Sequence, residues 1–373
     1  MPRVGLLISE RMLALARKGR SRERLPLYDR AARRHGIKLI YFTPAGVDFR
    51  RRRVRGYVYT GGGYRAVTAP LPSVVYRRII PTGARTRRVF QRLNRMPGVI
   101  VFNPPAQRNK LLVNRLLARH PEIGGSIPAT TPLRSAHRAL RFIRNHGTVY
   151  AKPAVGSVGR GVYRIRVRTT AAGEPRYEVS SWQGVVRLLS TAEMLRWLRA
   201  RGGGGRYILQ RGIDLAQHRG RPFDVRVTVQ RDGQGHWRVT GMVAKVARSG
   251  LPVTNLGRGG RTVRLSEALQ HGLPPSLRAA GRRRLRQLAL NVAHELSRHW
   301  PRMADLGLDL ALDHHGHPWF LEANLREQRP SPGEAGGKKA LRRQYAVPIA
   351  YAAFLARQRA RGGRRRAGGD GGT

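Results

Sequence analysis

The sequence of 373 residues contains no cysteine, so neither a disulfide framework nor a cysteine-based metal site can stabilise the fold. It also lacks an apolar run long enough to span a membrane. The first residues, Met1 to Met12, mix an acid and bases with a short apolar run, which is not the pattern of a secretory signal peptide. These absences predict a cytoplasmic protein without a membrane partner, long enough for roughly two or three lobes with buried cores.

Acidic residues are scarce, since 20 Asp and Glu stand against 73 Lys and Arg and give a net charge of +53. Arginine is spread through nearly every segment, whereas a nucleic-acid binder usually concentrates its charge on one face or tail. A compositional bias toward arginine therefore explains the charge better, and we expect no specific nucleic-acid partner. So strong a field would still attract an acidic polymer, which leaves a polyanion-binding protein open. Lysine occurs at only seven positions: Lys18, Lys38, Lys110, Lys152, Lys245, Lys338 and Lys339.

Against this background, residues 306–324 concentrate oxygen-bearing side chains. Leucines alternate with Asp309 and Asp313, which predicts a strand with an apolar face and an acidic face, and the end of the segment alternates in the same way. A tight turn that pairs Asp313 with Pro318 would place Asp309 directly opposite Glu322, with their Cβ atoms roughly 5 Å apart. The segment is therefore predicted to be a β-hairpin with two facing carboxylates.

Facing carboxylates repel each other unless a cation joins them. Oxygen ligands from Asp, Glu and Asn side chains suit a hard cation such as Mg²⁺ or Mn²⁺. We therefore predict a metal site formed by Asp309, Glu322 and Asn324. The alternative is a solvated hairpin face with scattered acids, which is the weaker interpretation in a chain so poor in acids.

A second signal lies at residues 149–161, where a strand reaches Lys152 and a glycine-rich loop follows. Gly156, Gly159 and Gly161 would let backbone N–H groups approach phosphate oxygens, and the lysine supplies a positive charge. The lysine precedes the glycines and a strand follows them, so the segment is not a P-loop. Because one of only seven lysines stands at its entry, phosphate binding is favoured over an ordinary β-turn.

Two strands predicted over 223–230 and 237–247 form the third signal. Asp224 and Arg226 share the polar face of the first strand. In the second, Lys245 has the same parity as Trp237, Val239 and Val243, so it is predicted to point inward, where it must find an anion. For any single arginine of this chain, including Arg248 just beyond the strand, an ordinary surface position is the simpler interpretation.

The remaining pattern alternates strands with helices. An α/β arrangement is expected at the N-terminus, without the G-x-G-x-x-G pattern that dinucleotide binding would need. A capping box at Ser190 to Glu193 predicts the start of a helix. Leu112, Leu116 and Leu117 are expected on one apolar stripe of another helix. Further strands are predicted at 4–8, 38–42, 54–60, 74–79, 149–152, 162–167 and 207–210, and helices at 24–35, 109–119, 282–299 and 345–356.

The phosphate loop, the strand pair with its cations, Asn255 before Gly259-Gly260, and the final D…E-x-N hairpin together resemble the ATP-grasp superfamily. The resemblance is closest to the YheC/YheD proteins, described as endospore coat-associated, and it covers most of residues 1–330. It implies an α/β and α+β protein with an ATP-grasp fold and an N-terminal α/β (pre-ATP-grasp) lobe. The implied parts are the N-terminal lobe 1–107, the ATP-grasp domain 108–330 with a phosphate-loop lobe 108–206 and a metal-site lobe 207–330, a C-terminal helix 331–358, and a disordered basic tail 359–373.

The same resemblance implies ATP and Mg²⁺ (or Mn²⁺) as cofactors and assigns site residues by position. Lys110 and Lys152 match the two nucleotide lysines, and Gln210 matches the start of the hinge that meets adenine. Asp309, Glu322 and Asn324 match the metal ligands. The loop over the phosphates corresponds to Gly156, Ser157, Gly159 and Gly161, the hinge backbone to Arg211 through Ile213, the polar residue before the glycine pair to Asn255, and the candidate catalytic cations to Arg226, Lys245 and Arg248.

The function implied by this resemblance is carboxylate–amine ligation through an acyl phosphate, with ATP converted to ADP. The carboxylate and amine substrates are unidentified, and spore-coat components or an acidic polymer are further expected partners. Two alternatives remain: an ATP-binding structural protein of the spore coat without turnover, and the polyanion-binding protein. Three positions depart from the family pattern: Gln210 where many members carry Glu, Lys245 where Arg is expected, and the segment after Asn324, which lacks the usual proline.

Overall fold

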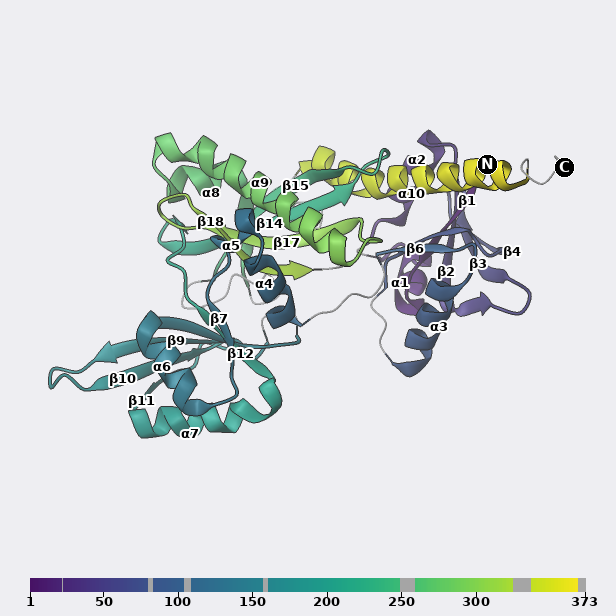
Figure 1. The fold of residues 1–373 in the computed structure, drawn as a ribbon. Coiled ribbons are helices and arrows are strands. Elements are labelled where there is room, and N and C mark those ends of the chain that lie inside the picture. Colours follow the sequence, from purple (N-terminus) through teal and green to yellow (C-terminus); the bar gives the residue numbers. More distant parts are fainter. Residues whose placement is uncertain are drawn as a thin grey trace.

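The protein is described by a computed structural model over residues 1–21, 23–79, 83–103, 109–156, 160–248, 259–324 and 337–367. It consists of three lobes, each built on a six-stranded sheet, and a long C-terminal helix (Figure 1). Among the described residues, none of the helices combines the length and the apolar character that crossing a bilayer would take.

The first lobe is a mixed sheet in the order β4-β3-β2-β1-β5-β6, in which β2, β1, β5 and β6 run parallel. Its central strands are buried on both faces: Val4 and Leu6 of β1 enter one core and Leu7 enters another. Helices α1 and α2 cover the first face and α3 the second. The elements are β1 (Arg3–Leu7), α1 (Glu10–Arg17), α2 (Leu25–Arg34), β2 (Lys38–Asp48), β3 (Arg53–Tyr59), β4 (Tyr64–Pro70), β5 (Val74–Arg77), α3 (Ala84–Arg95) and β6 (Ile100–Phe102).

The second lobe is a sheet in the order β11-β10-β9-β8-β12-β7, with helices packed on one face only. The predicted capping box is confirmed: the Glu193 N–H donates to Ser190 Oγ at 3.3 Å, and the Ser190 N–H donates to Glu193 Oε2 at 2.8 Å. The opposite face of the sheet is polar and carries Lys152. The elements are β7 (Thr130–Pro132), α6 (Ala136–His146), β8 (Thr148–Pro153), β9 (Tyr163–Thr169), β10 (Pro175–Ser181), β11 (Val186–Leu189), α7 (Thr191–Gly202), the 3-10 turn η1 (Gly203–Gly205) and β12 (Tyr207–Arg211).

The third lobe is an antiparallel sheet in the order β16-β15-β14-β17-β18, with β13 paired to β14. Its apolar face packs against α9, whose buried stripe includes the predicted Leu285, Leu288, Val292 and Leu296. The elements are α4 (Lys110–Ala118), α5 (Pro121–Gly124), β13 (Gln217–His218), β14 (Arg221–Arg231), β15 (Trp237–Val246), β16 (Arg261–Arg264), α8 (Leu265–Gly272), α9 (Pro275–His299), β17 (Asp305–Leu312) and β18 (Pro318–Asn324).

Helix α10 (Gly337–Ala367) joins the first and third lobes. Tyr345 and Ile349 are buried in the core of the first lobe, and the Gln344 carbonyl accepts from Gln230 Nε2 of β14 at 2.9 Å. Gly241 of β15 lies so close to the helix that a Cβ there would be 2.2 Å from Gln344 Nε2. The helix therefore covers one end of the polar face of the third sheet and leaves the other end, with Arg226, to the functional site.

A buried polar network also links the first and third lobes. Asp305 is fully buried and accepts from Arg78 Nη1 at 3.2 Å, from Gln230 Nε2 at 2.8 Å and from the Tyr76 hydroxyl. The guanidinium of Arg78, also fully buried, forms a fork with Glu23 at 2.8 and 2.9 Å. Because both charges are buried and paired, removing either partner would leave the other uncompensated.

Several expectations from the sequence need correction. Leu112, expected in the apolar stripe of α4, is 43% exposed, because Val113 and Leu117 form the buried side. The helix expected to end at residue 358 continues to Ala367, so the first part of the predicted disordered tail is helical. Residues 368–373 lie outside the described residues. The patterns also missed twelve α-helices and β-strands: α1, β4, α3, β6, α5, β7, α6, β10, β11, β13, β16 and α8.

Two boundaries drawn from the sequence separate segments that pack together. Helices α4 and α5, assigned to the phosphate-loop lobe, contribute Val113, Leu117 and Ile123 to the core of the third lobe. Strand β12, assigned to the metal-site lobe, pairs with β8 and β7 and so belongs to the second sheet.

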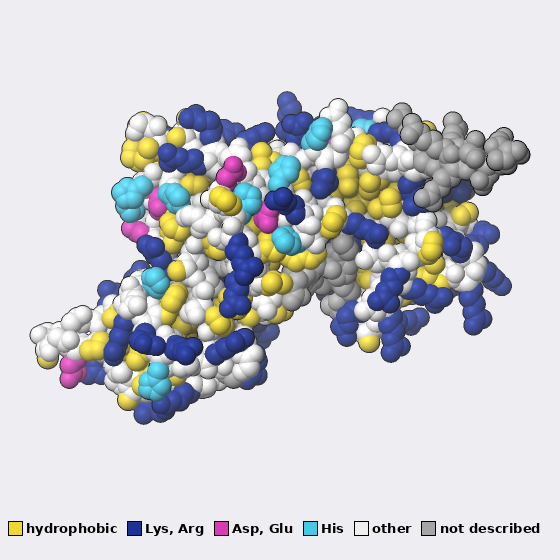
Figure 2. Space-filling view, in the orientation of Figure 1, with side chains coloured by type: hydrophobic (Ala, Val, Ile, Leu, Met, Phe, Trp, Pro, Cys, Tyr) yellow, Lys and Arg dark blue, Asp and Glu magenta, His cyan; other side chains and the backbone are white. Residues whose placement is uncertain are grey.

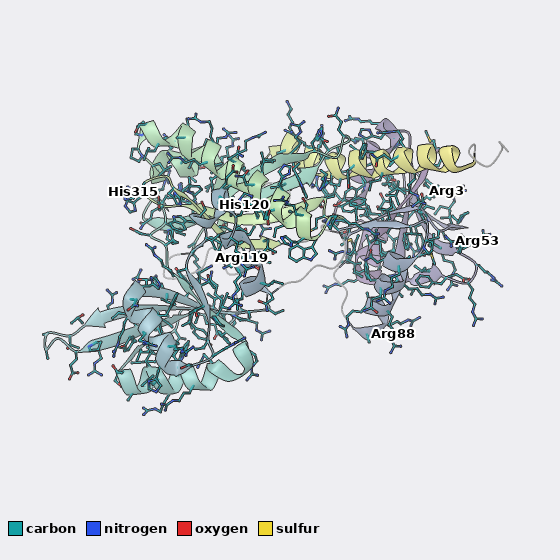
Figure 3. All side chains as sticks on the ribbon, viewed as in Figure 1. Arg3, Arg53, Arg88, Arg119, His120 and His315 are labelled. Carbon is teal, nitrogen blue, oxygen red and sulfur yellow. The ribbon has the colours of Figure 1, made fainter. Side chains whose placement is uncertain are left out.

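Basic side chains cover all three lobes in Figure 2, and acidic ones are few. Figure 3 labels several of them, including the exposed Arg3, Arg53 and Arg88 of the first lobe and Arg119 at the end of α4. This distribution agrees with the arginine spread seen in the sequence.

Candidate functional site

The β17–β18 hairpin brings its carboxylates together as predicted. Asp309 lies directly opposite Glu322, and Asn324 lies opposite Gly307. All three polar side chains are partly buried rather than fully exposed. The alternative of a solvated hairpin face therefore does not describe this segment.

The predicted turn register is wrong by one residue. Leu312, and not Asp313, lies opposite Pro318, because the turn is tighter than expected. Leu321 is left without a partner as a β-bulge, which restores the register at Asp309. The bulge also turns Phe320 into the core, where it is 1% exposed. The shorter turn and the bulge each shift the register by one residue, in opposite directions. The predicted pair of Asp309 and Glu322 is therefore correct although the predicted turn is not.

Asp309 collects three donors from three other strands. Arg226 forms a fork with both carboxylate oxygens, with Nε at 2.7 Å and Nη2 at 3.1 Å, because it faces Asp309 across β14 and β17. Lys245 Nζ lies 2.9 Å from Oδ1, and Asn324 Nδ2 donates to Oδ2 at 3.2 Å. Burial alone would raise the pKa of Asp309, but the charges of Arg226 and Lys245 outweigh it and hold the pKa well below its ordinary value.

Lys245 bridges two carboxylates. Its Nζ lies 2.9 Å from both Asp224 Oδ1 and Asp309 Oδ1, and its side chain is only 9% exposed. Burial lowers the pKa of Lys245, but the two carboxylates outweigh that effect and the pKa is raised above its ordinary value. The expectation that a buried lysine must find an anion is confirmed.

The predicted parity of Lys245 is wrong. Thr240 is an extra residue in β15, at a bulge opposite Thr228 and Val229 of β14. Trp237 and Val239 therefore enter the apolar core, whereas Lys245 points to the opposite, polar face.

Two lysines lie next to this cluster: Lys110 at the start of α4, in the third lobe, and Lys152 on β8, in the second lobe. Asn109 caps α4, accepting from the N–H of Leu111 at 3.0 Å, and the Lys110 N–H donates to the Ala154 carbonyl at 3.0 Å. The Lys110 side chain then lies 3.5 Å from Glu322 Oε2. Lys152 Nζ, on β8, donates to Gln210 Oε1 at 2.6 Å.

The pKa of Lys152 reports how close these charges are. Burial, and after it the charge of Lys110, lower the pKa of Lys152 to about 8, while Glu322, Asp224 and Asp309 act in the opposite direction. Two lysines from two lobes thus face three carboxylates of the third sheet. An additional polyanion would relieve the repulsion between Lys110 and Lys152, which is the chemistry expected of a phosphate site.

The hinge next to Gln210 offers fewer backbone groups than the sequence suggested. The Arg211 N–H donates to the Ala129 carbonyl at 2.9 Å, and the Gly212 N–H donates to the Thr148 carbonyl at 2.8 Å. The Arg211 side chain is exposed. Ile213 is the first hinge residue whose N–H has no protein acceptor within the described part of the chain, so it is the better candidate for an adenine contact.

The glycines of the loop after β8 are not equivalent. Gly161 has φ +75°, and a Cβ there would lie 3.0 Å from the Tyr207 hydroxyl and 3.1 Å from Pro153 Cγ. Gly156 has no positive φ, and a Cβ there would make only ordinary contact with Pro153 at 3.5 Å. Only Gly161 of these two is therefore required by the backbone as it stands.

Of four further predicted residues, the structure places one, Arg248, and it lies apart from the cluster. Arg248 is exposed at the end of β15, with its side chain against Gly259, and it forms no ion pair with the described members of the cluster. Ser157, Gly159 and Asn255 lie outside the described residues, and the structure does not place them.

The oxygen atoms that the hairpin offers could hold a metal ion only if phosphate oxygens also bind it. Within the described ranges, no group of three or more His, Asp or Glu side chains could hold an ion by itself. Asp309, Glu322 and Asn324 supply two carboxylates and an amide oxygen, which suits Mg²⁺ when phosphate oxygens and waters complete its octahedron. Asp309 is already engaged by Arg226 and Lys245, so a free cation would have to displace them.

Asp224 is the site residue whose role sequence reasoning missed. The sequence predicts its position beside Arg226 on the polar face of a strand, but not its contact with Lys245. Counting back from the observed Arg231–Trp237 pair without a bulge would place Ala244 opposite Asp224. Only the bulge at Thr240 brings Lys245 there, and Gly241, directly after it, is a sequence signal that could have found it, because a glycine inside a strand often marks a bulge.

The three lobes, with lysines and facing carboxylates held between the second and third, define an ATP-grasp fold with an N-terminal α/β lobe. The sequence model of the family described as YheC/D-like ATP-grasp matches residues 98–355. The chain belongs to this YheC/D-like ATP-grasp family, which confirms the resemblance drawn from its motifs.

Two curated relatives come from Bacillus subtilis (strain 168). The endospore coat-associated protein YheD is 25% identical over 288 residues, which are 76% of this chain and 63% of YheD. The endospore coat-associated protein YheC is 21% identical over 305 residues, which are 79% of this chain and 82% of YheC. The chain therefore spans somewhat less than two thirds of YheD.

Solved structures share the fold at low identity. The ATP-grasp ligase PsnB, complexed with precursor peptide PsnA2 and AMPPNP, has a TM-score of 0.53 and 14% identity, covering 95% of this chain and 98% of PsnB. The D-cycloserine synthetase DcsG has a TM-score of 0.51 and 17% identity, covering 96% of this chain and 99% of DcsG. These similarities establish the fold.

Proposed function

We propose that the protein is an ATP- and Mg²⁺-dependent carboxylate–amine ligase that acts through an acyl phosphate and is associated with the endospore coat. The observation that carries the proposal is the cluster in which Arg226 and Lys245 hold Asp309 while Lys110 and Lys152 approach from the other side. An ATP-grasp fold in which PsnB has been seen with Mg and ADP supports the choice of nucleotide and metal. The coat association follows the descriptions of YheC and YheD.

In the proposed reaction, a carboxylate oxygen attacks the γ-phosphorus of ATP and the bond from that phosphorus to the β–γ bridging oxygen breaks. The products are an acyl phosphate and ADP. An amine then attacks the acyl carbon, phosphate leaves, and the amine nitrogen loses a proton to solvent. The net reaction converts ATP, a carboxylate and an amine into ADP, phosphate and an amide.

The chain's contribution to this reaction is mostly positioning and charge neutralisation. Lys110 and Lys152 would bind phosphate oxygens. Arg226 and Lys245 would stabilise the transferring phosphoryl group, because they stand where its charge would develop. We keep Arg248 as a third candidate cation for the same role. Gly156, Ser157, Gly159 and Gly161 are proposed for the phosphate loop, Gln210, Arg211 and Ile213 for the adenine side, and Asn255 for a nucleotide contact.

Asp309, Glu322 and Asn324 would hold the Mg²⁺ ion. Bound there, the ion would supply further neutralisation of phosphate charge. Arg226 or Lys245 has to turn from Asp309 toward the phosphates before Asp309 can serve as a ligand. The metal should therefore bind together with nucleotide, and weakly without it.

Replacing Glu322 with Gln tests this assignment, because it removes one ligand charge and almost no volume. We expect Glu322→Gln to weaken Mn²⁺ binding in the presence of ATP about tenfold or more, measured by electron paramagnetic resonance of free Mn²⁺. Wild-type protein without ATP should hold little Mn²⁺ at the same concentrations. Glu174→Gln, at an exposed turn of the second lobe, is the matched control and should leave Mn²⁺ binding unchanged. Equal affinity in Glu322→Gln and wild type would remove Glu322 from the site.

A second candidate is an ATP-binding coat protein without turnover. The engagement of Asp309 by Arg226, Lys245 and Asn324 favours it, since a carboxylate so well paired has less need of a metal. Release of ADP separates the two functions. ADP release stimulated by a carboxylate and an amine, in a screen of amino acids, peptides and wall components, supports the ligase; tight ATP binding without any ADP release supports the coat protein.

A further inference from the structure

Arginines line the helix-free face of the second sheet next to the candidate phosphate site. Arg164, Arg166 and Arg168 alternate with the core residues of β9, and Arg176 of β10 lies opposite Arg168. We call these four side chains the arginine row. Alternate residues of a strand are about 7 Å apart, so the three on β9 form a regularly spaced line of cations.

The charge of the row is only partly neutralised by its described surroundings, since two acids lie beside four arginines. Glu178, opposite Arg166, is bound by Arg168 at 2.7 and 3.0 Å and lies 3.7 Å from Arg164, and Glu174 lies 3.5 Å from Arg176. Arg166 makes no hydrogen bond or ion pair with any described residue, and Arg164 Nε is buried without a partner among them. Burial and the adjacent Arg166 lower the pKa of Arg164, so an anion there would relieve a real electrostatic cost.

The arginine row leads away from the candidate phosphate site. Arg164 faces Tyr150 across β8 and β9, and Lys152 Nζ lies 5.5 Å from the Tyr150 ring on the same face. Exposure increases along the strand away from the glycine loop, from 21% for the Arg164 side chain to 53% for Arg168. A chain bound along the row would thus extend from solvent to the phosphate site.

The outer border of the same face is apolar and forms a free sheet edge. Val186 and Leu188 of β11 are 58% and 63% exposed, and they lie on the face of the arginine row because they pair with Ser180 and Glu178.

We propose that the arginine row and β11 bind an extended acidic segment of a polypeptide, whose carboxylates contact the arginines and whose small apolar side chains contact Val186 and Leu188. Arginine forks match carboxylates, and an extended segment lying across this face, parallel to β9, would repeat its acids at the spacing of the row. Exposed aliphatic side chains favour a polypeptide over a nucleic acid. The proposal deepens the proposed function by naming its substrate class, and it rests on that function only for turnover, because binding itself requires no nucleotide.

The test measures fluorescence anisotropy of a labelled extended peptide with glutamate at every second position and valine or serine between, at about 0.15 M salt. Arg164→Gln/Arg166→Gln should raise its Kd about tenfold, which corresponds to about 1.4 kcal/mol. Arg166→Gln alone, which breaks no described contact, should show a smaller change in the same direction. The matched control is Arg282→Gln/Arg283→Gln, which removes the same charge from exposed positions of α9 and should change Kd little.

Two comparisons decide the outcome. The peptide should bind more tightly than an oligothymidylate of equal charge, and the same peptide with glutamine for glutamate should not bind. Equal losses in the row variant and the α9 control, or equal binding of the oligothymidylate, would show unspecific attraction to a cationic protein and overturn the proposal. Calorimetry of ATP binding separates the peptide-binding proposal from the proposed ligase function. Normal ATP binding without peptide binding would contradict only the peptide-binding proposal. Peptide binding without ATP binding would contradict only the ligase function.

Discussion

At the scale of single residues, Lys152 is the most sensitive reporter of the site. It is partly buried, donates to Gln210 and stands near Lys110, so its pKa is lowered to about 8. A lysine in water keeps its proton to much higher pH. Lys152 therefore begins to lose its charge within the range in which enzymes are usually assayed.

This lowered pKa predicts a pH dependence of ATP binding. Phosphate oxygens favour the charged lysine, so ATP affinity should fall as pH rises from about 7 to about 9, and above pH 8 binding should take up a proton. Calorimetry in two buffers of different ionisation enthalpy measures that uptake directly. In Lys152→Arg, whose guanidinium stays charged, the affinity should lose this pH dependence. A wild-type affinity that stays constant over the same range would separate Lys152 from the phosphates.

Most of the charged cluster could be predicted from single residues of the sequence. Asp309, Glu322, Lys245 and Lys152 stood out because acids and lysines are rare in this chain. Arginines could not be ranked in the same way, since a chain rich in them offers no contrast. Arg226, which binds Asp309, and Arg78, which binds Glu23 and Asp305, look no different in the sequence from the exposed arginines of the surface.

At the scale of elements, β-bulges limited what the sequence could predict. The bulges at Leu321 and Thr240 each add one residue to a strand and reverse the parity of everything beyond it. Gly241 directly after Thr240 is a mark of the bulge in β15, whereas no glycine or proline adjoins Leu321. The stripe of α9 and several central strands are predicted correctly, whereas the face to which Lys245 points is not.

The two described ends of the glycine loop give an element-scale prediction. Gly161→Ala should lower the free energy of unfolding by about 1 kcal/mol or more and weaken ATP binding, because φ is positive and the new Cβ meets Tyr207 and Pro153. Gly156→Ala, at the start of the same loop, should change both the stability and the ATP affinity by much less. Urea unfolding and ATP calorimetry on the two variants provide the comparison. Equal effects would mean that the loop adopts another conformation when it works.

At the scale of the whole molecule, the buried pair of Arg78 and Asp305 joins lobes that are far apart in the sequence. Composition and periodicity carry no information about such a contact, since neither residue belongs to a recognisable motif. The same is true of α10, which the sequence placed correctly as a helix but not as the element shared by two lobes.

Breaking this pair should destabilise the protein strongly. Arg78→Met leaves Asp305 and Glu23 buried without their guanidinium, and we expect a loss of about 3 kcal/mol or more in the free energy of unfolding. Urea denaturation measures it, and Arg65→Met on the exposed face of β4 should stay within about 0.5 kcal/mol of wild type. A change of the same small size in Arg78→Met would mean that the lobes are held together by apolar contacts alone.

The linkage of the first and third lobes by α10 and the Arg78–Asp305 pair leaves the second lobe as the part connected most lightly. Its sheet is tied to the rest of the chain by the segments between α5 and β7 and between β12 and β13 (Figure 1). We expect the first and third lobes to act as a fixed jaw and the second lobe as a pivoting one. The proposed nucleotide would then enter and leave by rotation about these two segments, and the stiffness of that pivot would set how often the jaws part.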